Sequence, residues 1–316
     1  MTGHEILIPH SYSAEARETL APRFGALDGA SVVVTDTPDE TLDAFESATI
    51  ALTPRLPDEW LDRAHALEWA QATSAGYDHY DLEALEAAGV ALTTAAGVHG
   101  QPIGEWVLGA MLGFERELFV ARDQQRDGIW LRDGGGELAS KTVGIVGLGA
   151  IGRRVAELAS AVGCEVIGTK RDVSTVPDAV DEVFSADDLD AVLSRAEYLV
   201  LACPLTDETR HLIDEAAFST LSRDAIVVNV ARGGVVDQEV LVESLQQGRI
   251  AGAALDVFET EPLPADSPLW KLPNVLVTPH VAGSTPEYYD RVGDIFAENY
   301  RQFVTGDREE MRNRVV

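Results

Sequence analysis

A cluster of glycines near the middle of the chain could bind the phosphates of a dinucleotide. Residues 142–152 read TVGIVGLGAIG, an apolar strand that runs into the spacing G-x-G-x-x-G, and a helix is expected over residues 153–162. The first glycine allows a tight turn, the second lets the backbone approach a pyrophosphate, and the third lets the helix pack against the strand. The helix start adds unpaired N–H groups and a positive dipole end, which attract phosphate. The predicted phosphate-binding residues are Gly147, Gly149, Ala150, Ile151 and Gly152.

The end of the next expected strand bears on which dinucleotide binds. An NAD site usually carries an acidic residue there, which bonds the ribose 2′-OH. Here residues 166–172 read VIGTKRD, so Lys170 takes the acidic position and Arg171 follows it. Two cations suit a 2′-phosphate, and we therefore expect NADP(H) to be preferred. Asp172 could instead supply the acid while Lys170 and Arg171 face solvent, which would leave NAD(H) as the cofactor.

Three later segments place polar residues directly after an expected strand, where open α/β sheets carry their sites. The segments are residues 228–237, 254–262 and 278–285. Arg232 in the first could hold a carboxylate with its rigid fork of donors. His280 in the third could exchange a proton near neutral pH. Each could also be an ordinary surface or loop residue, so the functional interpretation depends on the joint spacing of the segments.

With these motifs the chain resembles the D-isomer-specific 2-hydroxyacid dehydrogenases over nearly its whole length. The resemblance is carried by the glycine turn, by PLTDET at residues 204–209 and by the three segments above. It implies that Arg232, Glu261 and His280 form a catalytic set, whereas Glu259 lies two residues before the position that the family uses. Arg232 would hold the carboxylate of a 2-keto acid and polarise its carbonyl, and His280 would donate the proton in reduction. Glu261 would orient the imidazole and favour its protonated form.

The resemblance also implies roles for residues outside this set. In the loop at residues 72–81, the backbone N–H groups of Ala75 and Gly76 would grip the substrate carboxylate, although an ordinary turn before an Asp-capped helix is the alternative. Leu56 is expected to shape the substrate pocket. Asp256 would contact the nicotinamide carboxamide. Further residues expected to line the cofactor cleft are Pro204, Thr206 and Gly283.

The expected function is NAD(P)H-dependent reduction of 2-keto acids to D-2-hydroxy acids, with the reaction reversible. Reduction of glyoxylate or hydroxypyruvate is the nearest enzymatic alternative. A dinucleotide-sensing corepressor is the alternative from a different class, since a binding protein can use the same fold. Consumption of NADPH in the presence of 2-keto acids would separate the enzymes from the binding protein.

The elements that position these residues form two series of alternating strands and helices. Apolar runs predict strands at residues 5–9, 31–34, 49–52, 67–71 and 90–93, and then at 142–147, 165–169, 198–202, 225–230, 251–257 and 275–278. Amphipathic stretches predict helices at residues 14–20, 39–47, 57–67, 81–88, 102–122 and 287–303. This pattern predicts an α/β protein with two Rossmann-like or flavodoxin-like domains, doubly wound parallel sheets and a cleft between the domains.

The predicted domain boundaries lie near residues 100 and 285. Residues 1–100 and 286–316 would form a substrate-binding (catalytic) domain, and residues 101–285 a dinucleotide-binding Rossmann domain. The long apolar helix at 102–122 and the loop after it resemble the dimer-forming region of the family, so a homodimer is expected. The charged tail, residues 306–316, is expected to fray.

The composition limits the partners and the location. The chain has 316 residues, with 53 Asp and Glu against 24 Lys and Arg, which gives a net charge of −29. Such a surface repels nucleic acid and anionic lipid, and neither a membrane span nor a secretory signal is evident, so a cytoplasmic protein is expected. Acidic excess with only three lysines favours adaptation to high salt, with drift in a GC-rich genome as the alternative. The two cysteines, Cys164 and Cys203, are too few for a disulfide framework or a Cys-rich metal site.

Overall fold

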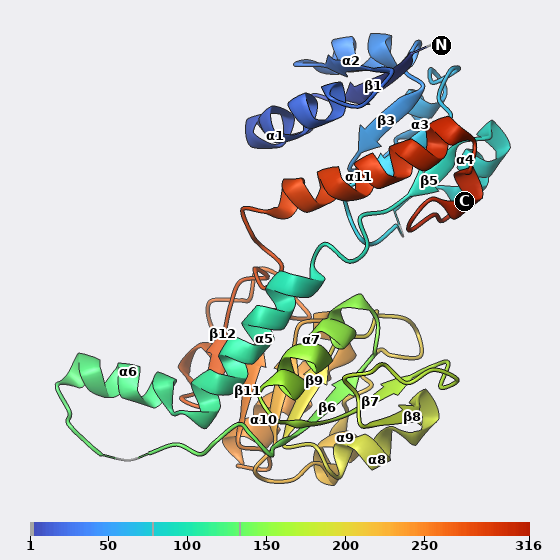
Figure 1. Ribbon diagram of the computed structural model, residues 1–316. Helices are drawn as coiled ribbons and strands as arrows, with labels where there is room; N and C mark the ends of the chain where they lie inside the picture. The colour runs from blue at the N-terminus through green and yellow to red at the C-terminus, as the bar shows by residue number, and fades with distance from the viewer. Residues whose placement is uncertain (1–2, 78, 133) are drawn as a thin grey trace. The chain divides into compact units, whose positions relative to one another are not determined.

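The computed structural model describes residues 3–77, 79–132 and 134–316. The chain divides into two compact units (Figure 1). Unit 1 comprises Met1–His99 and Thr285–Val316, and unit 2 comprises Gly100–Ser284.

Unit 1 is built on a five-stranded parallel sheet with the strand order β2-β1-β3-β4-β5. This is the flavodoxin-like order of doubly wound sheets. Neighbouring residues of β1 point to opposite faces, since Ile6 and Ile8 belong to one buried cluster and Leu7 to another. Helices therefore cover both faces. The elements are β1 (His4–Ile8), α1 (Ala14–Gly25), β2 (Ala30–Val34), α2 (Pro38–Phe45), β3 (Ile50–Thr53), α3 (Asp58–Leu61), β4 (Trp69–Ala72), α4 (Leu82–Ala88), β5 (Ala91–Thr93) and α11 (Tyr288–Thr305).

Unit 2 is built on a seven-stranded parallel sheet with the order β12-β11-β10-β9-β6-β7-β8. Counted from the first strand of this unit, the order is that of the dinucleotide-binding fold with one strand added at the edge. The predicted α/β class with two doubly wound parallel sheets is thus confirmed. The elements are α5 (Gly100–Glu115), α6 (Leu118–Asp127), β6 (Thr142–Val146), α7 (Ala150–Ala161), β7 (Glu165–Lys170), β8 (Glu182–Ser185), α8 (Leu189–Leu193), β9 (Tyr198–Leu201), α9 (Glu215–Thr220), β10 (Ile226–Asn229), α10 (Gln238–Gln246), β11 (Gly252–Leu255) and β12 (Val275–Val277).

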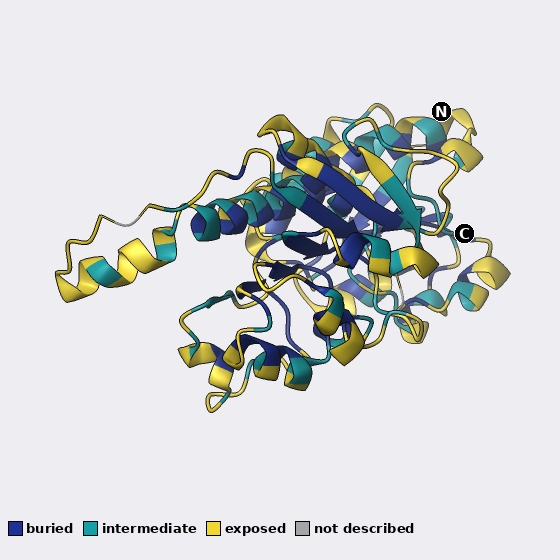
Figure 2. Ribbon diagram, turned by 90° about the horizontal axis from the view of Figure 1, so that it is seen from below, coloured by how far each residue is buried: buried dark blue, intermediate teal, exposed yellow. Residues whose placement is uncertain are grey.

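The single helix predicted over residues 102–122 is wrong, because the structure divides it into α5 and α6. Glu117 between them has a φ of 52°, in the left-handed region that ends a helix. The returning chain lies against this point: a Cβ at Gly135 would stand 2.8 Å from the Cα of Arg116. Beyond the break, α6 has no buried residue and extends away from the rest of unit 2 (Figures 1 and 2).

Two further predictions about unit 1 need correction. The helix predicted over 57–67 is only the four residues of α3, followed by turns. The tail does not fray, because it pairs with β5: Val315 N donates to Leu92 O at 2.8 Å, and Thr94 N donates to Asn313 O at 3.1 Å. Met311 is buried as well. Backbone pairing and burial hold a charged segment in place although its composition indicates disorder.

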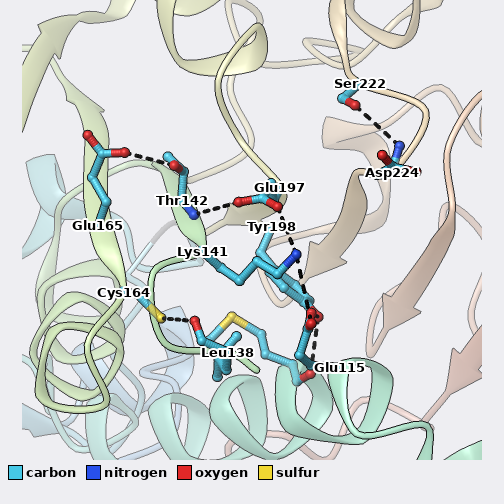
Figure 3. A network of polar contacts seen from close by, with 11 residues as sticks. Glu115, Leu138, Lys141, Thr142, Cys164, Glu165, Glu197, Tyr198, Ser222 and Asp224 are labelled. Atoms are coloured by element: carbon cyan, nitrogen blue, oxygen red, sulfur yellow. Dashed lines mark hydrogen bonds and ion pairs between the residues drawn. The ribbon is translucent and has the colours of Figure 1, made fainter. Parts of the chain in front are cut away.

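A polar network at the amino ends of the unit 2 strands ties α5 to the sheet (Figure 3). Lys141 Nζ donates to Glu197 Oε1 at 2.9 Å, and this hydrogen bond raises the pKa of Lys141. Tyr198, in the central strand β9, donates to Glu115 Oε2 at 2.8 Å. Burial raises the pKa of Tyr198, so its hydroxyl stays a donor. Because Glu115 is the last residue of α5, the network fixes the position from which α6 begins.

Candidate active site

The glycine turn lies between β6 and α7 and leaves open space at its middle glycine. Gly147 has a φ of 96°, and a Cβ there would stand 2.9 Å from the Cα of Cys203 after β9. A Cβ at Gly152 would stand 2.1 Å from Gly147 O. A Cβ at Gly149, by contrast, would meet nothing within 4 Å. Gly149 is also the N-cap residue of α7. Because it has no side chain to accept hydrogen bonds from the first N–H groups of the helix, phosphate oxygens can approach those groups. Ala150 and Ile151 supply the first of those N–H groups.

The loop after β9 adjoins this turn, at the point where the strand order of the sheet reverses. It carries Pro204 and Thr206, both exposed. Thr209 holds its shape, since the Thr209 hydroxyl donates to Pro204 O at 2.6 Å and accepts from Thr206 N at 2.8 Å. Ligands of doubly wound sheets bind at such a reversal.

Lys170 is the last residue of β7, the strand that follows α7, as expected from the sequence. Its Nζ donates to the carbonyl and the hydroxyl of Thr175 at 3.0 and 2.7 Å. Arg171 is exposed beside it. Asp172 accepts a hydrogen bond from Ser174 N at 2.9 Å, and hydrogen bonds from Ser174 lower the pKa of Asp172. The three candidates for reading the ribose 2′ position, Lys170, Arg171 and Asp172, therefore lie together at the end of β7.

The three predicted catalytic side chains follow three neighbouring strands of unit 2. Arg232 follows β10, Glu261 follows β11 and His280 follows β12, so all three lie at the same edge of the sheet as the glycine turn. His280 Nδ1 and Glu261 Oε2 are 2.8 Å apart. The second carboxylate oxygen of Glu261 accepts from Phe258 N at 3.0 Å. The pair leaves His280 Nε2 with no hydrogen-bond partner among the described residues.

The electrostatics of Glu261 bring Arg232 into the same site. Burial alone would raise the pKa of Glu261, but hydrogen bonds from His280 and from Phe258 N, with the positive charges of His280 and Arg232, lower it overall. The carboxylate is therefore ionised at neutral pH. An ionised acceptor on Nδ1 fixes the orientation of the imidazole ring, as a group that exchanges a proton through Nε2 requires.

Asp256 holds the backbone around His280. Its buried carboxylate accepts from the hydroxyl of Thr278 at 2.5 Å and from the N–H groups of Val281 and Ala282 at 2.8 Å each. Its backbone carbonyl accepts from His280 N at 2.8 Å. His280 has a φ of 55°, a conformation that costs a non-glycine residue about 1–3 kcal/mol unless its surroundings enforce it. The sequence did not indicate that Asp256 would hold the backbone around His280. The expected contact of Asp256 with the nicotinamide carboxamide remains a prediction. Gly283 lies in the same loop.

The segments that carry Arg232 and Glu261 pack directly on each other. A Cβ at Gly233 would stand 1.8 Å from the carbonyl carbon of Phe258, so only glycine fits there. Glu259 joins the same segments, because its Oε1 lies 3.0 Å from His211 Nε2 and 3.3 Å from the N–H of Gln238. Glu259 is thereby occupied in holding the loops, whereas Glu261 contacts the histidine.

The predicted carboxylate-binding loop of unit 1 follows β4. Ala95 N donates to Ser74 O at 2.9 Å, and Ser74 Oγ donates to Gly76 O at 2.7 Å. Nothing among the described residues accepts a hydrogen bond from the N–H of Ala75 or Gly76. Asp78, in the same predicted loop, lies outside the described residues. Leu56 lies in the loop after β3 and is partly buried against the core of this unit.

Two kinds of feature are absent from the described residues. No helix in them combines the length and the apolar character that a bilayer crossing requires. Within the same residues, no group of three or more His, Cys, Asp and Glu side chains is arranged to hold a metal ion.

Comparison with known proteins decides the family. The sequence profile described as "D-isomer specific 2-hydroxyacid dehydrogenase, NAD binding domain" matches residues 108–282. The chain belongs to the D-isomer-specific 2-hydroxyacid dehydrogenase family. It is therefore an oxidoreductase of that family with an NAD-binding domain.

Members of this dehydrogenase family with known names or structures resemble the chain over most of its length. A glyoxylate reductase of Thermofilum pendens is 36% identical over 266 residues, which are 81% of this chain and 77% of that protein. A D-3-phosphoglycerate dehydrogenase of Methanocaldococcus jannaschii is 34% identical over 282 residues, 87% of this chain but only 53% of that protein. The crystal structure of an NADPH-dependent glyoxylate/hydroxypyruvate reductase from Sinorhizobium meliloti, in complex with NADP and sulfate, has a TM-score of 0.80 and 30% identity and covers 99% of this chain and 98% of its own.

Proposed function

We propose that the protein is an NAD(P)H-dependent dehydrogenase that reduces 2-keto acids to D-2-hydroxy acids, with His280 as the proton donor. The observation that carries the proposal is the 2.8 Å hydrogen bond between His280 Nδ1 and Glu261 Oε2. This pair lies at the same edge of the sheet as the glycine turn, which suits a cofactor and a proton donor that act on one substrate. The substrate and the physiological direction are part of the proposal.

Apart from the hydride, which the cofactor would supply, each part of the reduction can be assigned to a group in the chain. A bound nicotinamide supplies the hydride that reduces C2 of the keto acid. Arg232 holds the carboxylate and polarises the carbonyl, so that negative charge can develop on its oxygen. His280 Nε2 donates a proton to that oxygen. Glu261 stays ionised, because its pKa is lowered, and balances the charge on the ring before the proton leaves.

We propose a separate role for each unit. Unit 2, with residues 101–285 as the expected domain, would bind the dinucleotide at Gly147–Gly152 and carry the catalytic set. Unit 1, with residues 1–100 and 286–316 as the expected domain, would bind the substrate carboxylate through the N–H groups of Ala75 and Gly76. The unpartnered state of those two N–H groups among the described residues supports this role, since a carboxylate would satisfy both.

We propose that NADP(H) is preferred and that NAD(H) can be used. The support is the position of Lys170 at the end of β7, where NAD sites carry an acid. In Lys170→Asp, kcat/KM for NADPH relative to NADH should fall about tenfold or more, because a charge-assisted hydrogen bond is lost. The matched control is Lys271→Asp, which changes an exposed lysine of the same unit and should leave the ratio unaltered. An unchanged ratio in Lys170→Asp would contradict the assignment.

Glyoxylate and hydroxypyruvate are the specific substrates that the relatives' names favour. The experiment that tests the function is NADPH and NADH consumption with a panel of 2-keto acids, from glyoxylate to branched-chain acids, in molar salt. We expect turnover with several of them and the highest kcat/KM with the small ones. Binding of NADPH without turnover of any acid would identify a dinucleotide-sensing binding protein and refute the proposal.

We further propose that the protein is a homodimer formed through α6 and the loop after it. This part of unit 2 exposes apolar side chains that its own unit does not cover. Relative exposures are 55% for Leu118, 48% for Val120, 48% for Ile129, 86% for Trp130 and 60% for Leu131. Several exposed apolar side chains in one segment are typical of a protein interface, and a second copy with the same surface can cover them reciprocally.

The acidic surface supports the proposal that the protein works in a salt-rich cytoplasm. A net charge of −29 must also be reconciled with anionic ligands. Salt screens the long-range repulsion, and fixed groups such as Arg232 and Lys170 attract the ligands locally.

A further inference from the structure

Two tyrosine hydroxyl groups converge on Thr73, at the start of the proposed carboxylate-binding loop. Tyr288, the first residue of α11, donates a hydrogen bond from its hydroxyl to Thr73 O at 2.5 Å. The hydroxyl of Tyr12 lies 3.1 Å from Thr73 Oγ1. Thr73 is buried and directly follows β4. Thr73, two residues before Ala75, is thus held through its carbonyl and through its side chain by two segments far away in the sequence.

The bond from Tyr288 persists over the pH range in which an enzyme is assayed. A backbone carbonyl can only accept, so the bond requires the phenol to be protonated. Burial raises the pKa of Tyr288 to about 12, and burial also raises the pKa of Tyr12 well above its ordinary value. The restraint on Thr73 is therefore insensitive to pH near neutrality.

Few other contacts hold this loop. The N–H of Thr73 lies a long 3.4 Å from Thr53 O, which is at the limit of a hydrogen bond. Ser74 is held through its carbonyl by Ala95 N, and its hydroxyl bonds to Gly76 O within the loop itself. Rotation of the peptide that follows Thr73 would redirect the N–H groups farther along. The Tyr288 hydroxyl bonds to the oxygen of that same peptide and so opposes the rotation.

Tyr288 also contacts the segment through which the chain leaves unit 1. Its ring stacks on His99, with 5.3 Å between ring centroids and an angle of 25° between planes. His99 is the last residue of the first part of unit 1, and Tyr288 is the fourth residue of the returning part. The ring is thus held in place by a contact that does not involve its hydroxyl, and replacing the hydroxyl alone leaves that contact.

We propose that Tyr288 is a positioning residue that orients the N–H groups of Ala75 and Gly76 for the carboxylate of the substrate. The inference deepens the proposed function and rests on it. Tyr288 acts through the peptide of Thr73 and does not touch the substrate. Its loss should weaken the binding of carboxylates without affecting the nucleotide.

The test compares Tyr288→Phe with Tyr300→Phe. Tyr300 lies on the same helix and also donates to a backbone carbonyl, Asp28 O at 3.1 Å, so the two variants lose the same kind of bond. In Tyr288→Phe, KM for the keto acid should rise about fivefold to tenfold, as expected for one lost hydrogen bond, with KM for NADPH unchanged. In Tyr300→Phe both KM values should match the wild type. An unchanged KM for the keto acid in Tyr288→Phe, or an equal rise in both variants, would overturn the proposal.

A second measurement does not depend on turnover. Hydrogen exchange of the peptide that covers residues 73–77 is followed in the wild type and both variants, with and without oxalate as the carboxylate probe. We expect hydrogen exchange of this peptide to be faster in Tyr288→Phe than in the wild type and in Tyr300→Phe. Oxalate should slow the exchange in all three proteins, and least in Tyr288→Phe. Identical exchange in all three proteins would overturn the positioning role. Failure of the wild type to reduce any keto acid would instead refute the proposed function, which keeps the two outcomes distinct.

Discussion

Replacing Asp256 with asparagine should disturb His280 although the two side chains do not touch. The carboxylate accepts three hydrogen bonds from residues 278–282, and these hold His280 at its φ of 55°. An amide has one oxygen in place of two. With Oδ1 still serving Thr278 and Val281, the new NH₂ group would face the N–H of Ala282, a donor opposite a donor.

The size of the effect follows from these contacts. One charge-assisted bond is lost and a buried N–H is left unsatisfied, which costs about 1.5–3 kcal/mol. The two remaining bonds change from charged to neutral acceptors and lose about half their strength, while removal of a buried charge offsets part of the loss. We expect the free energy of unfolding to fall by about 3 kcal/mol. Because a displaced His280 no longer aligns with Glu261, kcat should fall by roughly a hundredfold.

The assay measures urea unfolding and keto acid turnover in molar salt for Asp256→Asn and Asp214→Asn. Asp214 is an exposed N-cap that accepts one bond from Ala217 N at 3.0 Å, and asparagine caps a helix equally well. The control therefore makes the same chemical change in the same unit with almost no expected effect. Unfolding free energies within about 0.5 kcal/mol of each other and equal kcat values in the two variants would refute the reasoning.

Three further predictions concern assembly, acid and salt. Trp130→Glu should convert the proposed dimer to a monomer, as measured by size-exclusion chromatography with light scattering. The control Val304→Glu, at a 44% exposed site on α11, should leave the dimer intact. A Trp130→Glu variant that is still a dimer would show that this surface does not form the interface. Glu261 has a pKa lowered from its ordinary 4.5, so its ionised form stabilises the fold above pH 4.5 and this contribution disappears as pH falls through the lower folded value. The stability advantage of wild type over Glu261→Gln should therefore shrink as pH falls below about 4.5, and an advantage that grows on acidification in this range would contradict the sign. Transfer from about 1 M to about 0.01 M salt lengthens the screening distance from about 3 to about 30 Å, so repulsion among the carboxylates should lower Tm, and full retention of Tm and activity would argue against adaptation to salt.

Most strands were predictable because parallel strands are buried on both faces and read as short apolar runs. Tyr198–Leu201, buried throughout, is such a run. The edge strand β8 is partly exposed and was missed, since Glu182–Ser185 lacks a continuous apolar stretch. The break at Glu117 was missed because it depends on where the returning chain passes, which no local pattern records.

The placement of the proposed catalytic side chains was predictable for a topological reason. Polar residues directly after parallel strands must meet at one edge of the sheet, so Arg232, Glu261 and His280 could be placed together from their motifs alone. The residues that hold the surrounding loops in place could not be predicted from the sequence. The hydrogen bonds of Asp256 to the His280 loop and of Tyr288 to Thr73 join residues far apart in the sequence, and an aspartate or a tyrosine carries no local signal of such a partner.

The central claim is that His280 donates the proton in a D-specific reduction. The direct test measures hydroxypyruvate turnover with NADPH by wild type and His280→Ala, with chiral analysis of the glycerate produced. We predict D-glycerate from the wild type and a kcat at least about a hundredfold lower in His280→Ala, since general acid catalysis contributes that much. Near-normal kcat in His280→Ala, or L-glycerate from the wild type, would contradict the account.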